Sequence, residues 1–251
     1  MQVPYRQLQS FRVQLNTKVI LLGYLLRNLL LKPFRRHSLH GDHNYFNKNL
    51  FPLSAELEKS YQDILPELMN IVGMFQRLAP FQEISPHQTY ISNDDKWKLF
   101  FLRGAGINFK RNWKLAPKTW AIFARHPEAV SVYVSILGPH KALNEHEGPW
   151  AGVLRMHLGI DIPNEKLCAL FCNGEQRHWK NGEVLVFDDT YPHIALNCTD
   201  KLRAVLFIDI MRPLPQPWNA INWIVLRLSI LLPYIWLPLI RHWRWARRFY
   251  Q

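Results

Sequence analysis

The sequence lacks several features that mark particular protein classes. It has only three cysteines, Cys168, Cys172 and Cys198, and an odd, small number argues against a disulfide framework and for a reducing compartment. Cys168 and Cys172 share a predicted strand, and we interpret them as small buried core residues rather than as a metal or redox pair. Zinc-finger spacing, a basic heptad region and an RNP-type aromatic motif are all missing, so no nucleic-acid partner is predicted.

Acidic residues are scarce relative to basic ones. Among 251 residues, 31 Lys and Arg outnumber 19 Asp and Glu, which gives a formal net charge of +12. This balance predicts an anionic partner, and because the basic residues are densest at the two ends, beside apolar runs, it favours a membrane surface. The length predicts one domain with end segments, and 48% hydrophobic residues suffice for a substantial core. Nothing in the sequence implies an obligate protein partner.

The N-terminal apolar run, Val19 to Leu31, reads VILLGYLLRNLLL and is interrupted by Arg27 and Asn28. It is shorter than the roughly 20 apolar residues that comfortably span a bilayer, and no signal-peptide cleavage site follows it. We therefore predict that residues 1–40 form a basic, apolar segment that associates with a membrane.

The C-terminal apolar run, Ile221 to Ile240, has spanning length but contains Arg227 and two prolines, and the stretch RHWRWARRFYQ follows it. Aromatic and Arg side chains are typical anchors at headgroup depth, so residues 216–251 are predicted to associate with a membrane as well. The two runs either lie flat in the interface or enter it as a shallow pair. The alternative is that both are helices packed on a soluble core. If either run spans, the arginines after it place the C-terminus in the cytoplasm.

Between the ends, residues 41–215 have the pattern of one β-rich domain with a helical cover. Leu53 to Phe75 has apolar residues at helical spacing, which predicts a helix or a helix pair. Short alternating or apolar runs follow without helices between them, which predicts an antiparallel sandwich or barrel. The dipeptides Asn173-Gly174 and Asn181-Gly182 are hairpin signals. The predicted strands cover Trp97 to Phe101, Val130 to Leu137, Gly152 to Ile160, Leu167 to Phe171, Val184 to Phe187 and Ala204 to Ile210.

One predicted strand carries two basic side chains among apolar ones. In the segment LRMHL, alternation puts the leucines and the methionine on one face and Arg155 and His157 on the other. A dry core face would desolvate both basic side chains without partners, at a cost of several kcal/mol. An anionic group must therefore meet them inside, or that face is wet.

Two histidines and an arginine surround this strand in the sequence. His146 lies in a turn before it, His193 follows a later strand and a Tyr-Pro turn, and Arg203 opens the last strong strand. Two imidazoles hold Fe(II) and leave positions open for a bidentate keto acid and dioxygen. A guanidinium on a later strand pairs bidentately with a distal carboxylate better than an ammonium does. This order is what an Fe(II)/2-oxoglutarate oxygenase requires.

Four segments between Trp97 and Pro213 carry a resemblance: APKT, SILGPHKALNEHEGPWAGVLRMHLGI, NGEVLVFDDTYPHIALN and RAVLFIDIMRP. They are similar to the aspartyl/asparaginyl β-hydroxylase family, a branch of the Fe(II)/2-oxoglutarate oxygenases. The resemblance implies a mainly β fold with a double-stranded β-helix (jelly-roll or cupin-like) core, flanking helices and hydrophobic terminal helices. Within the family, PWAG, HWKNGEVLVFDDTYPH and a later Trp-Asn stretch are similar to the bacterial lipid A 2-hydroxylase group.

The resemblance also implies roles for six residues. It makes His146 and His193 the iron ligands, and it makes Ser135, Arg155, His157 and Arg203 the contacts to 2-oxoglutarate. Gly148 stands where many oxygenases carry an acidic third ligand, and water is able to fill that position.

Several neighbouring residues have open roles. Glu145 or Glu147 is an alternative metal ligand, although side chains adjacent to His146 in a turn point elsewhere. Asp188 and Asp189 are either metal ligands together with His193 or groups that orient its imidazole, and we favour the second role. Trp150 and Trp179 line the substrate entrance or pack at its rim.

We therefore predict a dioxygenase that hydroxylates an unactivated C–H bond, with Fe(II) as cofactor and 2-oxoglutarate and dioxygen as co-substrates. The basic, apolar ends favour a fatty acyl chain of a membrane lipid, either lipid A or an ornithine-type aminolipid. Two alternatives stay open: a peptide aspartyl/asparaginyl β-hydroxylase, favoured by Gly148, and a non-catalytic lipid-binding module of the same fold. The lipid hypothesis predicts a membrane-associated enzyme whose catalytic domain lies on the cytoplasmic face, at the inner membrane of a bacterium.

Overall fold

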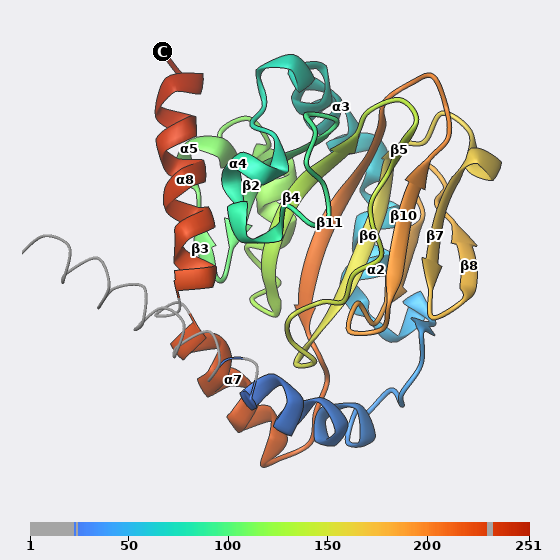
Figure 1. Cartoon of the computed structure of the whole chain (residues 1–251), viewed down its shortest axis with the longest axis vertical. Helices are drawn as coiled ribbons and strands as arrows, with labels where there is room; N and C mark the ends of the chain where they lie inside the picture. The colour runs from blue at the N-terminus through green and yellow to red at the C-terminus, as the bar shows by residue number, and fades with distance from the viewer. Residues whose placement is uncertain (1–22, 24, 230–232) are drawn as a thin grey trace, which may run out of the picture.

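The structure is a computed structural model that describes residue 23, residues 25–229 and residues 233–251 (Figure 1). Its strands are β1 (Tyr45–Phe46), β2 (Trp97–Gly104), β3 (Ile107–Asn108), β4 (Ala129–Leu137), β5 (Lys141–Ala142), β6 (Val153–Asp161), β7 (Cys168–Cys172), β8 (Glu175–His178), β9 (Val184–Phe187), β10 (His193–Asn197) and β11 (Arg203–Met211). Its helices are one at residues 25–36, α2 (Pro52–Lys59), α3 (Tyr61–Gly73), α4 (Phe81–Ile84), α5 (Lys110–Trp113), α6 (Pro117–Phe123), α7 (Trp218–Ser229) and α8 (Pro233–Phe249).

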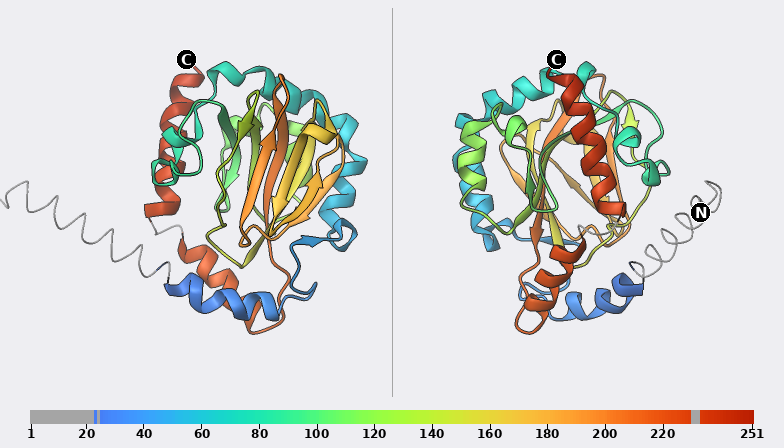
Figure 2. Two further views of the ribbon diagram at one scale, coloured as in Figure 1. Left: turned by 45° about the vertical axis from the view of Figure 1, so that its right-hand side comes forward. Right: turned by 90° about the vertical axis from the view of Figure 1, so that its left-hand side faces the viewer.

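Two antiparallel sheets face each other, and helices cover the outer face of the larger sheet (Figure 2). The larger sheet has the strand order β1-β9-β6-β11-β4-β2-β3, and the smaller has the order β5-β10-β7-β8. The strands from β4 to β11 are thus divided between two ladders, β4-β11-β6-β9 and β5-β10-β7-β8, in the pattern of a double-stranded β-helix. This confirms the predicted fold class, a mainly β jelly roll with flanking helices.

Two apolar layers hold these elements together. The outer layer joins the larger sheet to its helices, and there Leu154 and Met156 of β6 belong to one buried cluster with Leu68 of α3. The inner layer lies between the sheets and includes Val205 of β11 and Leu170 of β7. The predicted alternation in β6 is confirmed, because the apolar side chains enter the outer layer and the basic ones face the inner side.

The two hairpin predictions have different outcomes. Asn173 and Gly174 have φ angles of 50° and 79° and form the tight turn between β7 and β8, so this hairpin is confirmed. The Asn181-Gly182 prediction is wrong, because this turn leads from β8 of the smaller sheet to β9 of the larger. Gly182 still adopts a left-handed φ of 75°. An Asn-Gly turn therefore also suits a chain reversal that passes from one sheet to the other.

The described parts of both end segments contact the central domain. Phe34 is fully buried in a cluster with Ala151 and Leu214, and His242 of α8 is fully buried against β2. No helix in the described ranges is long and apolar enough to cross a membrane. Residues 19–22 and 24 of the first apolar run and 230–232 of the second lie outside the described residues. The membrane association of residues 1–40 and 216–251 stays a prediction.

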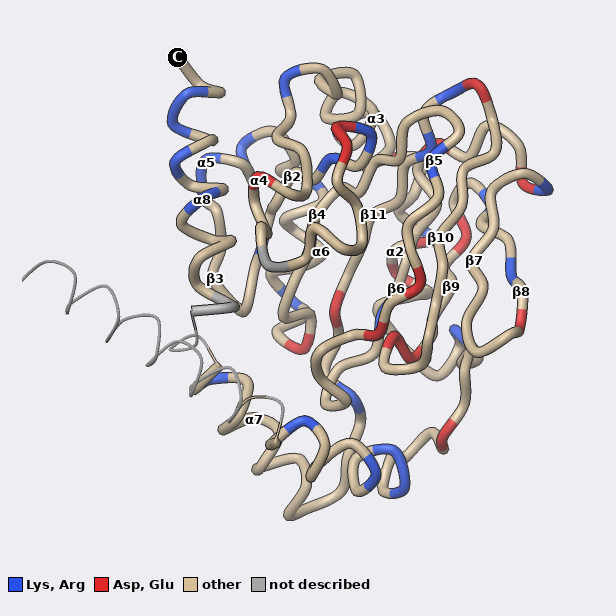
Figure 3. The backbone as a smooth tube through the Cα atoms, viewed as in Figure 1, with Lys and Arg blue, Asp and Glu red and all other residues tan. Residues whose placement is uncertain are grey.

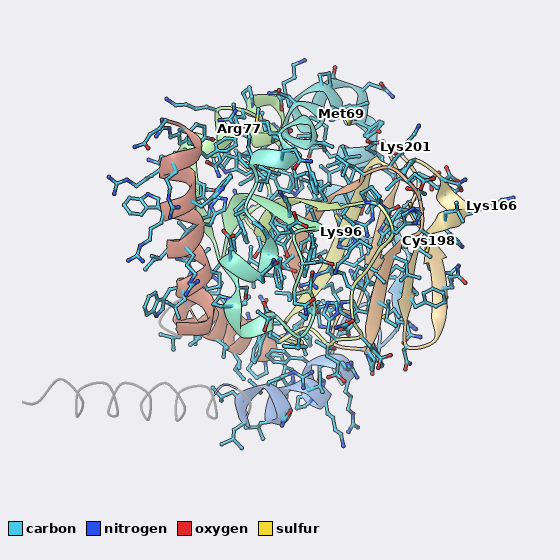
Figure 4. The ribbon with its side chains drawn as sticks, turned by 45° about the horizontal axis from the view of Figure 1, so that its top comes forward. Met69, Arg77, Lys96, Lys166, Cys198 and Lys201 are labelled. Carbon is cyan, nitrogen blue, oxygen red and sulfur yellow. The ribbon has the colours of Figure 1, made fainter. Side chains whose placement is uncertain are left out.

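The three cysteines are free thiols. Cys168 and Cys172 are buried on β7 between the sheets, which confirms that they are core residues. Cys198 is exposed on the loop between β10 and β11 (Figure 4).

Candidate active site

A cavity of about 210 Å³ lies between the two sheets. Its wall includes all six residues to which the sequence assigned a role: Ser135, His146, Arg155, His157, His193 and Arg203. The remaining wall is largely apolar and includes Leu99, Leu143 and Leu239. The fold therefore brings the predicted site residues together beside an apolar space.

His146 and His193 face each other across a short antiparallel bridge. The His146 amide donates to the His193 carbonyl at 3.2 Å, and the His193 amide donates to the His146 carbonyl at 2.9 Å. Residues that oppose each other in this way carry their side chains on the same face. The two imidazole centroids accordingly lie 4.2 Å apart.

Main-chain carbonyls fix the tautomer of both rings. Nδ1 of His146 donates to the Asn144 carbonyl at 2.8 Å, and Nδ1 of His193 donates to the Tyr191 carbonyl at 3.0 Å. Because a carbonyl only accepts, the proton is on Nδ1 and each Nε2 keeps a lone pair. Burial lowers the pKa of His146 to about 4 and the pKa of His193 well below its ordinary value, so both rings are neutral at pH 7. Two neutral imidazoles with available lone pairs suit a divalent metal ion.

The carboxylates of Asp188 and Asp189 do not orient these rings, so that interpretation of the sequence is wrong. Asp188 is fully buried and pairs with Arg212, while Asp189 lies 2.8 Å from Nη2 of Arg155. The carbonyl two residues before each histidine occupies Nδ1 of its ring. The carboxylates of Asp188 and Asp189 pair with Arg212 and Arg155 instead.

The absence of a side chain at Gly148 makes room for Asp189. A Cβ at position 148 would lie 2.0 Å from Oδ2 of Asp189, and the Gly148 amide donates to the Asp189 carbonyl at 2.6 Å. Burial raises the pKa of Asp189 to about 7. Over the described ranges, no group of three His, Cys, Asp or Glu side chains is placed to hold a metal, and Glu147 pairs instead with Arg27. Among the residues that the structure describes, no third side chain therefore joins the two histidines as a potential ligand.

Arg155 has protein carboxylates as partners. Its Nη2 lies 2.8 Å from Asp189 Oδ2 and 3.1 Å from Asp209 Oδ1, and its guanidinium carbon lies 4.1 Å from the centroid of the Phe207 ring. The argument that an anion must meet Arg155 is confirmed, and the chain itself supplies that anion. Its predicted contact with 2-oxoglutarate stays a prediction.

Arg203 is buried without an anionic partner among the described residues. Its guanidinium carbon lies 3.9 Å from the centroid of a Trp179 ring, its Nε has no hydrogen-bond partner, and burial lowers its pKa to about 9. Nε1 of Trp179 donates to Nδ1 of His157 at 3.2 Å. His157 is neutral, because burial lowers its pKa well below the ordinary value, so its Nε2 carries a proton that also lacks a partner.

These two unpaired groups line the same cavity and would suit an anionic ligand. A buried cation and a buried N–H donor are costly to leave unpaired, and a carboxylate ligand would satisfy both. The Ser135 hydroxyl accepts from Nε1 of Trp97 at 3.1 Å and retains its own hydrogen to donate. The residues present therefore fit a small dicarboxylate beside a metal held by two histidines.

Of the two tryptophans with open roles, one is buried and the other is partly buried. Trp179 is almost fully buried beneath Arg203, and Trp150 packs edge-on against Phe34 while its Nε1 donates to Asn222 at 2.9 Å. Sequence reasoning missed Asp209, although an acidic residue within the apolar strand RAVLFIDI was a visible signal.

Comparisons with known proteins show the family to which the chain is similar. The profile of a family described as Aspartyl/Asparaginyl beta-hydroxylase matches residues 58–213. An ornithine lipid ester-linked acyl 2-hydroxylase of Rhizobium tropici is 41% identical over 212 residues, which is 84% of this chain and 75% of that protein. Human aspartyl/asparaginyl beta-hydroxylase is 31% identical over 166 residues, which is 64% of this chain and 21% of that protein. Among solved structures, DMSP lyase DddQ of Ruegeria pomeroyi is 13% identical with a TM-score of 0.33, over 46% of this chain and 47% of that one.

Proposed function

The chain belongs to the aspartyl/asparaginyl β-hydroxylase family, and on that premise we propose that it is an Fe(II)- and 2-oxoglutarate-dependent dioxygenase that hydroxylates a fatty acyl chain of a membrane lipid. One observation carries the proposal. The same cavity is lined by the neutral imidazoles of His146 and His193, each with Nε2 available, and by Arg203. The buried guanidinium of Arg203 has no anionic partner among the described residues.

His146 and His193 would hold the iron, whose chemistry when bound is the activation of dioxygen coupled to oxidation of the keto acid. Their Nδ1 hydrogen bonds keep both rings in the ligating tautomer. The position beside Gly148 is left to water or co-substrate, because Asp189 fills the space that a side chain there would need.

Arg203, His157 and Ser135 would bind the distal carboxylate of 2-oxoglutarate. A planar guanidinium offers two parallel N–H donors, and burial strengthens each of these hydrogen bonds. Arg155 holds Asp189 and Asp209 in place, and in this proposal it also faces the co-substrate from the cavity wall.

The apolar part of the wall supports an acyl substrate. Leu99, Leu143 and Leu239 line the cavity, and an unactivated methylene chain needs an apolar, dry channel to reach the site. The Rhizobium tropici relative acts on an ornithine lipid by its name, so the proposed substrate is an ornithine-type aminolipid or lipid A. We also propose that the chain associates with the membrane surface with its catalytic domain on the cytoplasmic side, because the anionic cytoplasmic leaflet attracts basic segments such as the two ends of this chain.

The alternative is a peptide aspartyl/asparaginyl hydroxylase, and the similarity to the human enzyme of that name supports it. The third hypothesis, a non-catalytic module, is opposed by the intact set of His146, His193 and Arg203 around one cavity.

Lipid mass spectrometry tests the proposal. A bacterial host that makes ornithine lipids and lipid A should gain one oxygen atom on an acyl chain when it expresses the full chain. The same host expressing His146→Ala or His193→Ala, each folded by circular dichroism, should show no gain. Unchanged lipids together with a hydroxylated Asp or Asn in a peptide assay would establish the alternative, and full activity of either variant would refute the ligand assignment.

A further inference from the structure

The helix at residues 25–36 contacts both loops that carry the candidate iron ligands. Arg27 pairs with Glu147 at 2.5 Å, and its Nε donates to the Gly148 carbonyl at 3.4 Å, directly after His146. Arg35 donates to the Thr190 hydroxyl at 2.7 Å and lies 3.6 Å from the centroid of the Tyr191 ring, just before His193. One helix therefore bridges two loops that are far apart in the sequence.

The contact with the His193 loop reaches a buried charge. Arg35 Nε lies 3.7 Å from Oδ2 of Asp188, a fully buried carboxylate whose other oxygen accepts from Thr190. Arg212 also pairs with Asp188, so this carboxylate keeps a cation if Arg35 is replaced. Arg35 thus braces the loop without being the sole support of a buried charge.

The same helix packs against α7, and the two are side by side in Figure 1 and Figure 2. Their inner faces share one apolar cluster in which Leu31 and Phe34 of the first helix meet Trp218 and Ile221 of α7. The α7 residue Asn222 is fully buried and donates to the Gly152 carbonyl at 2.7 Å, which ties α7 to the segment after the His146 loop. We call residues 25–36 together with α7 the two-helix platform.

The outer face of the two-helix platform is apolar and exposed. Leu25 and Leu29, one helical turn apart, are 66% and 69% exposed. On α7, Trp223 and Leu228 are 51% and 57% exposed, with Ile224 beside them. Large apolar side chains gathered on one face of paired helices mark an interaction surface.

Charge indicates what covers this face. All 19 acidic residues lie between Asp42 and Asp209, so the net charge of +12 comes from the two ends of the chain. Figure 3 shows Lys and Arg, without Asp or Glu, along residues 25–36, α7 and α8. Lys32, Arg36 and Arg227 are exposed on the same two helices. Exposed basic side chains on helices that also expose Leu and Trp complement an anionic bilayer surface, where apolar side chains enter the interface and cations meet phosphates.

We propose that the two-helix platform docks on an anionic phospholipid bilayer and that Arg27 and Arg35, as positioning residues, transmit docking to the two iron-ligand loops. Docking favours the helix orientation in which both arginines hold their loops, so it raises metal affinity, and bound metal strengthens docking in return. The inference rests on the proposed function for the identity of the metal site, but it requires neither a particular lipid substrate nor turnover.

The test uses the full chain, Mn²⁺ as a redox-inert substitute for Fe(II), and vesicles of phosphatidylcholine with or without phosphatidylglycerol. Electron paramagnetic resonance gives the Mn²⁺ affinity, and co-sedimentation gives vesicle binding. We expect the wild type to bind the anionic vesicles and its Kd for Mn²⁺ to fall about 5-fold when they are added, the lower range of allosteric coupling. Neutral vesicles should have little effect.

Substitutions at the leucines and at the arginines separate vesicle binding from metal affinity. Leu25→Ser with Leu29→Ser should lose vesicle binding and the vesicle effect, with an unchanged Mn²⁺ Kd in solution. Arg27→Gln with Arg35→Gln should bind Mn²⁺ more weakly even without vesicles, and each single variant should show part of that loss. Lys166→Gln is the control, because it removes an exposed charge outside the two-helix platform and should leave both the solution Kd and vesicle binding unchanged.

The outcomes distinguish this inference from the proposed function. The coupling is overturned if anionic vesicles leave the Mn²⁺ Kd of the wild type unchanged. It is also overturned if the Arg27→Gln with Arg35→Gln variant binds Mn²⁺ with the wild-type Kd. A dimer that the leucine variant converts to a monomer, with vesicle binding unaffected, would assign the face to a second copy and overturn the docking. A wild type that binds no Mn²⁺ at all would refute the proposed function itself.

Discussion

Arg155 and Arg203 line the same cavity from the paired strands β6 and β11, yet their surroundings differ. Both guanidinium groups stack on an aromatic ring, Phe207 for Arg155 and Trp179 for Arg203. Arg155 has Asp189 and Asp209 within ion-pair distance, whereas no described carboxylate pairs with Arg203. A buried cation that the chain neutralises serves the fold, while one left unpaired keeps its hydrogen-bonding capacity for a ligand.

The largest effect is expected for Arg155→Met. It leaves Asp189 and Asp209 without their cation, so the free energy of unfolding should fall by about 3–5 kcal/mol. Urea denaturation of the metal-free protein, followed by circular dichroism, measures the loss. The exposed Arg177 supplies the control, because Arg177→Met should shift stability by less than about 0.5 kcal/mol. If Arg155→Met is as stable as the control, Arg155 does not stabilise the fold and the contrast with Arg203 is lost.

Arg203→Met should show the opposite behaviour. The Kd for 2-oxoglutarate, measured by calorimetry with Mn²⁺ in the site, should rise by about 30-fold or more, equivalent to a loss of about 2 kcal/mol of binding free energy. The free energy of unfolding of the ligand-free protein should stay equal or increase, because a buried unpaired charge has been removed. Destabilisation with intact 2-oxoglutarate binding would make Arg203 a structural residue like Arg155.

Gly148→Ala tests whether Asp189 needs the space beside the histidines. The new Cβ would lie 2.0 Å from Oδ2 of Asp189, so overpacking should lower the free energy of unfolding by about 1–3 kcal/mol. In an Asp189→Ala background the same substitution should be nearly neutral. A double-mutant cycle in urea measures this coupling, and strictly additive effects would show that the two positions do not compete.

The effect of pH is the most gradual, because it is spread over about three pH units. The pKa of Asp189 is about 7 in the folded protein and near 3.8 in the unfolded chain, so its ionisation opposes folding. Its contribution should make the free energy of unfolding of the metal-free protein fall as pH rises from about 4 to 7, by at most about 1.4 kcal/mol per pH unit. Asp189→Asn should flatten that dependence by the same amount. An identical pH profile in the variant would mean that Asp189 is already ionised throughout this window.

The sequence was sufficient where the deciding pattern is local. Alternation within β6 placed Arg155 and His157 on the inner face, and the order of His146, His193 and Arg203 along the chain located the cavity. The helix pair, the turn at Asn173 and the separate sheet strands follow from similar short-range rules.

The partners of those residues depend on contacts between distant segments, which local patterns do not encode. Asp209 reaches Arg155 only through the register of β11 against β6, and Arg35 reaches Thr190 only because an end segment folds back onto the domain. The Asn181-Gly182 turn failed as a hairpin for the same reason, since its flanking strands pair in different sheets.

If His146 and His193 hold iron as proposed, the bridge between them keeps the pocket in shape without the metal. Each ligand residue is held by the main chain of the other, and each ring is held by a carbonyl of its own turn, so the cation contributes little to shaping the loops. Under the proposed function, chelation should therefore abolish activity without unfolding the protein, and added iron should restore activity as fast as it binds. A cell that runs short of iron would then keep the protein folded and ready to bind the metal again.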